Sequence, residues 1–159
     1  MGVRPRAGIV VGVDGSEGSR AALRWALAEA QRWRSPLRII YASGPPAVGP
    51  RGPGLLTLAY AVGAVEGKAE RTLAASLEGI VDPGAADDVP ISAEVVRAPP
   101  QVALVEAGES AQLLVVGARG ARPHLLGIGS VSAVCCHDAR CPVVVVPTDH
   151  PSDDQPRPR

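Results

Sequence analysis

The stretch that decides the fold is AGIVVGVDGSEGSRAALRWALAEAQRWRSPLRIIYAS, residues Ala7–Ser43. Its opening apolar run ends in Asp-Gly-Ser, a pattern typical of a strand buried on both faces of a parallel sheet. Ser35-Pro36 ends the amphipathic helix that follows, and LRIIYAS predicts a second strand. The apolar face of that helix comprises Ala22, Leu23, Ala26, Leu27, Ala30 and Trp33. These segments predict a β-α-β unit.

The rest of the chain repeats this alternation of strands and helices. Further strands are predicted in ISAEVVRA (91–98), AQLLVVGA (111–118) and PVVVVP (142–147), and helices at 55–77, 99–110 and 130–139. This order predicts an α/β fold with an open, doubly wound, five-stranded parallel sheet and helices on both faces. We expect an N-terminal extension at 1–6, one domain at 7–147 and a disordered tail at 148–159, with a surface loop at Gly44–Gly54.

Composition narrows the class of protein. The 159 residues suit a single domain, and the formal net charge of zero gives no field that would attract nucleic acid or an anionic membrane. No stretch approaches the roughly 20 apolar residues of a membrane span, and the N-terminus lacks the pattern of a signal peptide. Three cysteines, two of them adjacent, fit a reducing compartment. We therefore expect a cytoplasmic protein without nucleic-acid or membrane partners.

Two common nucleotide-binding motifs are excluded by their residues. Lys68 is the only lysine in the chain and follows no glycine-rich loop, which argues against a Walker-type NTPase. The first strand is followed by GVDGSEGS and not by Gly-x-Gly-x-x-Gly, which argues against an NAD site. In a doubly wound sheet, ligands bind beyond the carboxyl ends of the strands where the strand order reverses. Asp14-Gly15-Ser16 and Gly117-Ala118-Arg119-Gly120 are expected to meet there.

Two blocks of sequence resemble the universal stress protein family. They are IVVGVDGSEGSRAALRWA near the start, and LLVVGARG with GSVSAVCCHDARCPVVVVP near the end. The resemblance implies the strand order 3-2-1-4-5 and a homodimer that forms through the last strand, Pro142–Val146. Nucleotide-binding members carry Gly-x-x-Gly, nine residues, then Gly-Ser or Gly-Thr. Here Gly117 and Gly120 match the first pair and Gly129-Ser130 the second, but only eight residues, Ala121–Ile128, separate them.

The physical reason for this glycine pattern is close approach to phosphate. Glycine lets the backbone approach phosphate oxygens, the start of a helix presents unpaired N–H groups, and Arg119 adds a bidentate cation. The resemblance implies that Asp14 contacts the adenosine moiety and that the backbone of Ala42 contacts adenine. The ligand implied is ATP, with magnesium left open. The candidate nucleotide-binding residues are Asp14, Ala42, Gly117, Arg119, Gly120, Gly129, Ser130 and Val131.

Several of these residues also have plain structural interpretations. Asp14 suits an Asp-Gly turn, and Ser16 and Ser130 are both expected to be N-caps worth roughly 1 kcal/mol each. Arg122 and His124 suit a solvated loop. CCHDARC offers four potential metal ligands, but its two adjacent cysteines point about 100° apart on a helix, so we expect buried thiols and no metal.

The function predicted is an ATP-binding, stress-response dimer without catalytic residues. The sequence supplies no positioned base or set of carboxylate metal ligands for phosphoryl transfer, so at most slow ATP hydrolysis is expected. Two alternatives stay open. One is a nucleotide-free interaction module whose shortened loop has lost the phosphate site, and the other is an enzyme on a related fold.

Overall fold

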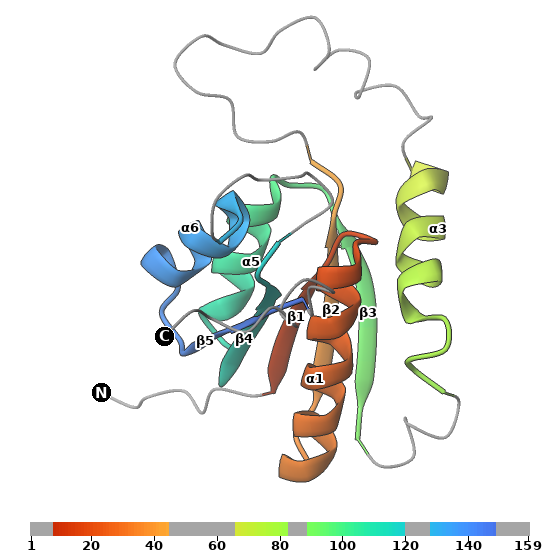
Figure 1. Cartoon of the computed structure of the whole chain (residues 1–159), viewed down its shortest axis with the longest axis horizontal. Helices are drawn as coiled ribbons and strands as arrows, with labels where there is room; N and C mark the ends of the chain where they lie inside the picture. Colours follow the sequence, from red (N-terminus) through yellow and green to blue (C-terminus); the bar gives the residue numbers. More distant parts are fainter. Residues whose placement is uncertain (1–7, 45–65, 83–88, 120–127, 149–159) are drawn as a thin grey trace, which may run out of the picture.

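The computed structural model describes residues 8–44, 66–82, 89–119 and 128–148 of the chain (Figure 1). The predictions for the extension at 1–6, most of the Gly44–Gly54 loop, the helix before Glu66 and the tail after Thr148 lie outside these residues.

Strands and helices alternate through the described residues, and the strands form one parallel sheet. The sheet order is β3-β2-β1-β4-β5, so the predicted topology is confirmed. The elements are β1 Ile9–Val13, α1 Glu17–Trp33, β2 Leu37–Ala42, α3 Glu66–Leu77, β3 Ile91–Val96, α5 Pro100–Gly108, β4 Leu113–Gly117, α6 Ser130–Asp138 and β5 Val143–Val146.

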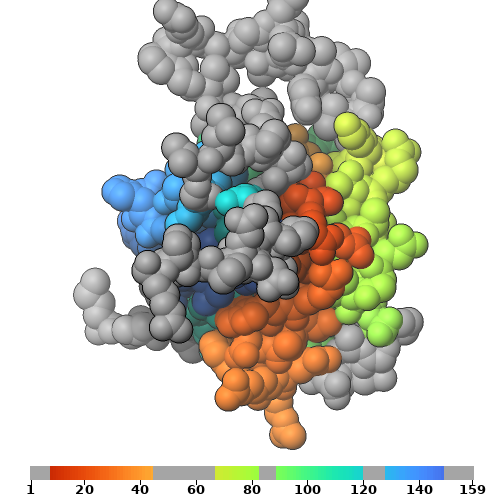
Figure 2. All heavy atoms as spheres, viewed as in Figure 1, coloured from red at the N-terminus to blue at the C-terminus, as the bar shows by residue number. Residues whose placement is uncertain are grey.

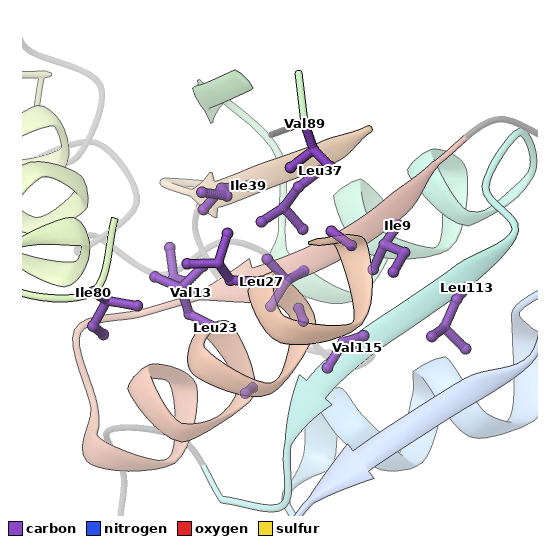
Figure 3. Close-up of a cluster of buried hydrophobic side chains, with 14 of the residues drawn as sticks. Ile9, Val13, Leu23, Leu27, Leu37, Ile39, Ile80, Val89, Leu113 and Val115 are labelled. Carbon is purple, nitrogen blue, oxygen red and sulfur yellow. The ribbon is translucent and has the colours of Figure 1, made fainter. Parts of the chain in front are cut away.

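The helices cover both faces of the sheet, with α1 and α3 on one face and α5 and α6 on the other (Figure 1). Ile9, Val11 and Val13 of β1 pack into the cluster beneath α1 and α3 (Figure 3). The intervening Val10 packs into a second cluster with Leu104 of α5. Side chains of a strand alternate between faces, so a strand covered on both faces needs the unbroken apolar run seen in the sequence.

Two predictions of burial were wrong. Trp33 is 50% exposed, because it is the last residue of α1 and the chain turns away at Arg34, whose φ of 49° is left-handed. Cys135 and Cys141 are buried as predicted, but Cys136 is exposed because neighbouring helical residues point about 100° apart. Burial raises the pKa of the Cys135 thiol to about 12, so this sulfur stays protonated and unreactive near neutral pH.

Candidate functional site

The turn after β1 is built by Asp14. Its Oδ1 accepts hydrogen bonds from the Ser16 N–H (3.0 Å) and the Ser16 hydroxyl (2.5 Å). Gly15 between them has a φ of 84°, a conformation that favours glycine. Asp14 is exposed at the carboxyl end of β1, and a carboxylate offers about four acceptor positions. The same side chain therefore shapes the turn and presents a carboxylate at the sheet edge.

A small serine network joins this turn to α1. Ser16 is the N-cap, as predicted, because its Oγ accepts from the Ser19 N–H at 3.1 Å. The buried Ser19 hydroxyl donates to the Ser16 carbonyl (2.9 Å) and accepts from the Asp14 N–H (3.2 Å). The role of Ser19 was not predicted from the sequence. The feature that could have indicated it is a second serine three residues after the N-cap. The network fixes the direction in which α1 leaves the sheet.

The two ends of the glycine-rich loop are joined directly. The Ala118 N–H donates to the Val146 carbonyl at 2.7 Å, and the Gly129 N–H donates to the Ala118 carbonyl at 2.7 Å. The end of β4 therefore lies beside the start of α6, as the motif requires. Gly120 and the rest of 120–127 lie outside the described residues.

Close backbone packing explains two of the glycines near this edge. A Cβ on Gly117 would lie 2.6 Å from the carbonyl carbon and oxygen of Gly18, and one on Gly18 would lie 2.3 Å from the Arg119 carbonyl oxygen. Such distances leave no room for a side chain. The first turn of α1 thus rests directly on the end of β4, and Gly117 is needed for this packing apart from any ligand.

The start of α6 differs from the prediction. Gly129 occupies the N-cap position (φ −63°, ψ 157°) without a side-chain cap, and Ser130 is the first helical residue, so the prediction that Ser130 is an N-cap was wrong. Its side chain is exposed. Instead, the buried hydroxyl of Ser132, a residue that was not among the predicted ones, donates to the Gly117 carbonyl at 2.6 Å and links α6 to β4. Its burial could have been predicted from its position, three residues before Cys135 and therefore on the same face of the helix. The first N–H groups of a helix lack acceptors within it.

The two serines are expected to differ in their effect on stability. Ser16→Ala removes a real N-cap and should lower the free energy of unfolding by about 1 kcal/mol. Ser130→Ala removes no cap and should change it by less than about 0.5 kcal/mol. Urea denaturation of both variants measures the difference. Equal losses would mean that Ser130 also caps its helix.

The remaining candidates lie at the same edge. Ala42 ends β2 next to β1, and its position pairs with Val96 of β3. Val131 is partly buried and packs against the α5 and α6 side of the core. Arg119 follows β4 and is partly buried. Most of the predicted residues therefore meet where β1 and β4 end, and Ala42 lies one strand away.

The CCHDARC segment shows a pair of exposed groups. His137 Nδ1 lies 2.5 Å from Asp138 Oδ1, and this hydrogen bond raises the pKa of the imidazole. Among the residues that the structure describes, there is no group of three or more His, Cys, Asp or Glu side chains placed to hold a metal ion. In the same residues, no helix is long and apolar enough to cross a bilayer.

The chain matches the model of the Universal stress protein family over residues 7–147. It belongs to the universal stress protein family. Universal stress protein Rv3134c of Mycobacterium tuberculosis (strain ATCC 25618 / H37Rv) is 34% identical over 156 residues, which cover 96% of this chain and 52% of the relative. This universal stress protein thus spans about half the length of that curated relative.

Solved structures show the same fold. Universal stress protein UspA from Lactobacillus plantarum superposes with a TM-score of 0.68 at 22% identity, over 91% of this chain and 99% of the other. A universal stress protein solved in complex with cAMP is 28% identical, with a TM-score of 0.56, over 90% of this chain and 99% of the other.

Proposed function

We propose that this universal stress protein binds ATP at the carboxyl ends of β1 and β4. The observation that carries the proposal is the hydrogen bond between the Gly129 N–H and the Ala118 carbonyl, at 2.7 Å. It holds the two glycine-containing ends of the loop together although the loop is one residue shorter than the family pattern. The missing residue therefore does not separate the anchors.

The start of α6 suits the phosphates. A helix N-terminus presents N–H groups without intrahelical acceptors and the positive end of the helix dipole. Because Gly129 caps α6 without a side chain, no side chain of the cap itself accepts from those groups. The exposed Ser130 adds a hydroxyl, and Arg119 at the end of β4 brings a guanidinium to the same edge.

The turn at Asp14 suits the nucleoside. Its exposed carboxylate is held by Ser16, so its position is fixed before a ligand arrives. Carboxylate oxygens accept hydrogen bonds from ribose hydroxyls or the adenine amino group. The relative solved with cAMP supports an adenine nucleotide as the class of ligand. ATP is the member of that class that uses both the nucleoside and the phosphate side of the site.

We propose a binding role and not an enzymatic one. Phosphoryl transfer needs a base or a water-positioning group, and metal ligands, next to the phosphates. Asp14 is engaged in shaping the turn at the nucleoside end, which supports binding over catalysis. Magnesium, if present, would accompany the ATP phosphates. Steady ATP turnover that is abolished by Asp14→Asn would contradict this role.

The nucleotide site is tested by what the purified protein carries. Acid extraction followed by chromatography should release an adenine nucleotide, and competition among ATP, ADP, AMP and cAMP should rank ATP first. No released nucleotide, together with no binding up to about 1 mM ATP, would contradict the proposal and leave a nucleotide-free interaction module.

We also propose that the protein is a homodimer that pairs through β5. This strand lies at one edge of the sheet, and an apolar edge strand tends to pair with another chain. The carbonyls of Pro142 and Val146 accept from β4, from the N–H groups of Leu114 (3.0 Å) and Ala118 (2.7 Å). Backbone groups alternate along a strand, so Val145 directs its N–H to the outer edge.

Val145→Pro is expected to convert the dimer to a monomer. Proline removes the outward N–H while leaving the pairing of β5 with β4 in place. Val145→Thr keeps both the N–H and a β-branched shape and serves as the control. Sedimentation equilibrium measures both. A Val145→Pro protein that folds and remains dimeric would place the interface elsewhere.

A further inference from the structure

A hollow lies between α1 and α3, away from the start of α6. Its volume is about 300 Å³, at the small end of ligand sites. The two helices run side by side on this face of the molecule (Figure 2). The lining includes Gly15, Arg20, Lys68, Arg71 and Thr72. Neither Lys68 nor Arg71 belongs to the proposed nucleotide site or to the proposed dimer interface.

Three cationic side chains line this hollow. Lys68 and Arg71 are exposed and lie one turn apart on α3. Within the described residues, neither side chain forms an ion pair with a carboxylate. Arg20 of α1 is held in place, because its guanidinium donates to the carbonyls of Ala75 (2.7 Å) and Glu78 (3.1 Å) at the end of α3. Arg20 therefore forms a fixed positive wall, and the other two cations retain their donors.

Glu70, the carboxylate next to Arg71 in the sequence, is exposed and is not among the residues that line the hollow. The two carboxylates near Gly15 form contacts of their own. Glu17 pairs with Arg24 at 3.3 Å, and Asp14 accepts both hydrogen bonds from Ser16. The Thr72 hydroxyl donates to the Lys68 carbonyl at 2.9 Å, so it offers an acceptor and not a donor to a ligand. The Ser76 hydroxyl, which also lines the hollow, donates to the Thr72 carbonyl at 2.7 Å. The side-chain donors that remain in the hollow are the cationic ones, and they favour an anion.

We propose that this hollow binds the phosphoryl group of a small phosphorylated molecule, at a site separate from the nucleotide site. Arginine presents a planar fork to phosphate oxygens and lysine a mobile point charge, a combination that suits a dianion. Gly15 forms one wall without a side chain: a Cβ there would lie 2.9 Å from Cγ2 of Thr72. The inference stands whether or not ATP binds beyond β1 and β4.

The test is an NMR titration of the full-length protein with inorganic phosphate and with glycerol 3-phosphate. Both probes should shift the amides of Gly15 and Thr72 in a saturable way below about 10 mM. A tighter response to glycerol 3-phosphate supports a phosphate ester as the ligand, and a tighter response to inorganic phosphate would overturn the phosphorylated molecule in favour of the free anion. No saturable shift of these amides overturns the proposal.

Two double variants make the test specific. Lys68→Gln with Arg71→Gln should weaken binding of both probes at least about tenfold, because both mobile cations are lost. Arg32→Gln with Arg140→Gln removes the same charge from exposed sites outside the hollow and should leave binding unchanged. Equal weakening in both variants would show a general charge effect and overturn the site. If the Lys68→Gln, Arg71→Gln variant loses as much affinity for ATP as for the two probes, the hollow is not separate from the nucleotide site.

Discussion

Gly18→Ala is expected to lower the free energy of unfolding by about 3 kcal/mol, near the upper end of the cost of overpacking. The new methyl group would lie 2.3 Å from the Arg119 carbonyl oxygen, which is backbone and cannot rotate away. Either α1 must shift from β4, or the end of β4 must move. Both shifts would also separate the turn at Asp14 from Arg119.

Gly67→Ala is the matched control, because both glycines lie in helices. At Gly67 the nearest atom to a new Cβ is Nη1 of Arg71 at 3.5 Å, the mobile end of a long side chain. Alanine should therefore raise the free energy of unfolding, by about 0.5 to 1 kcal/mol. Denaturant unfolding of both variants measures the contrast. A Gly18→Ala protein as stable as wild type would show that α1 does not rest on β4 as described.

Ser130→Asp is expected to weaken ATP binding at least about tenfold without loss of stability. A carboxylate in the first turn of α6 interacts favourably with the helix dipole, so folding is maintained or slightly improved. The same carboxylate repels phosphate, and two like charges about 4 Å apart at a protein surface cost several kcal/mol. Calorimetry with ATP and thermal unfolding measure the two effects separately.

Two controls separate repulsion from a change of shape. Ser130→Asn is close in size to aspartate without its charge and should retain ATP binding within about threefold. Adenosine, which lacks phosphate, should bind wild type and Ser130→Asp equally. If Ser130→Asp binds ATP as well as wild type does, the phosphates do not lie at the start of α6.

The strands and their order followed from the sequence because burial leaves a direct signal. The run before Asp14 is apolar at every position except glycine, and β1 is covered by helices on both faces. The crossover rules and the family resemblance then gave the strand order. The convergence of Asp14 with the end of β4 depends on this topology and was predicted with it.

Contacts between distant backbone segments left no such signal. Nothing near Gly18 indicates that its hydrogen faces the Arg119 carbonyl, because that contact depends on how α1 packs on β4. The prediction of the N-cap of α6 was wrong for a local reason. Gly129 and Ser130 are both residue types that suit an N-cap, and the backbone conformation decides which of them occupies the position. The prediction that Trp33 is buried was wrong because helical spacing does not show where the sheet beneath a helix ends.

The most direct test of the nucleotide site is an NMR titration of the protein with ATP. The site beyond β1 and β4 predicts that the largest amide shifts occur at Asp14, Gly117 and Ser130 and saturate at one ATP per chain. The absence of shifts up to about 1 mM ATP, or shifts confined to the hollow between α1 and α3, would contradict it.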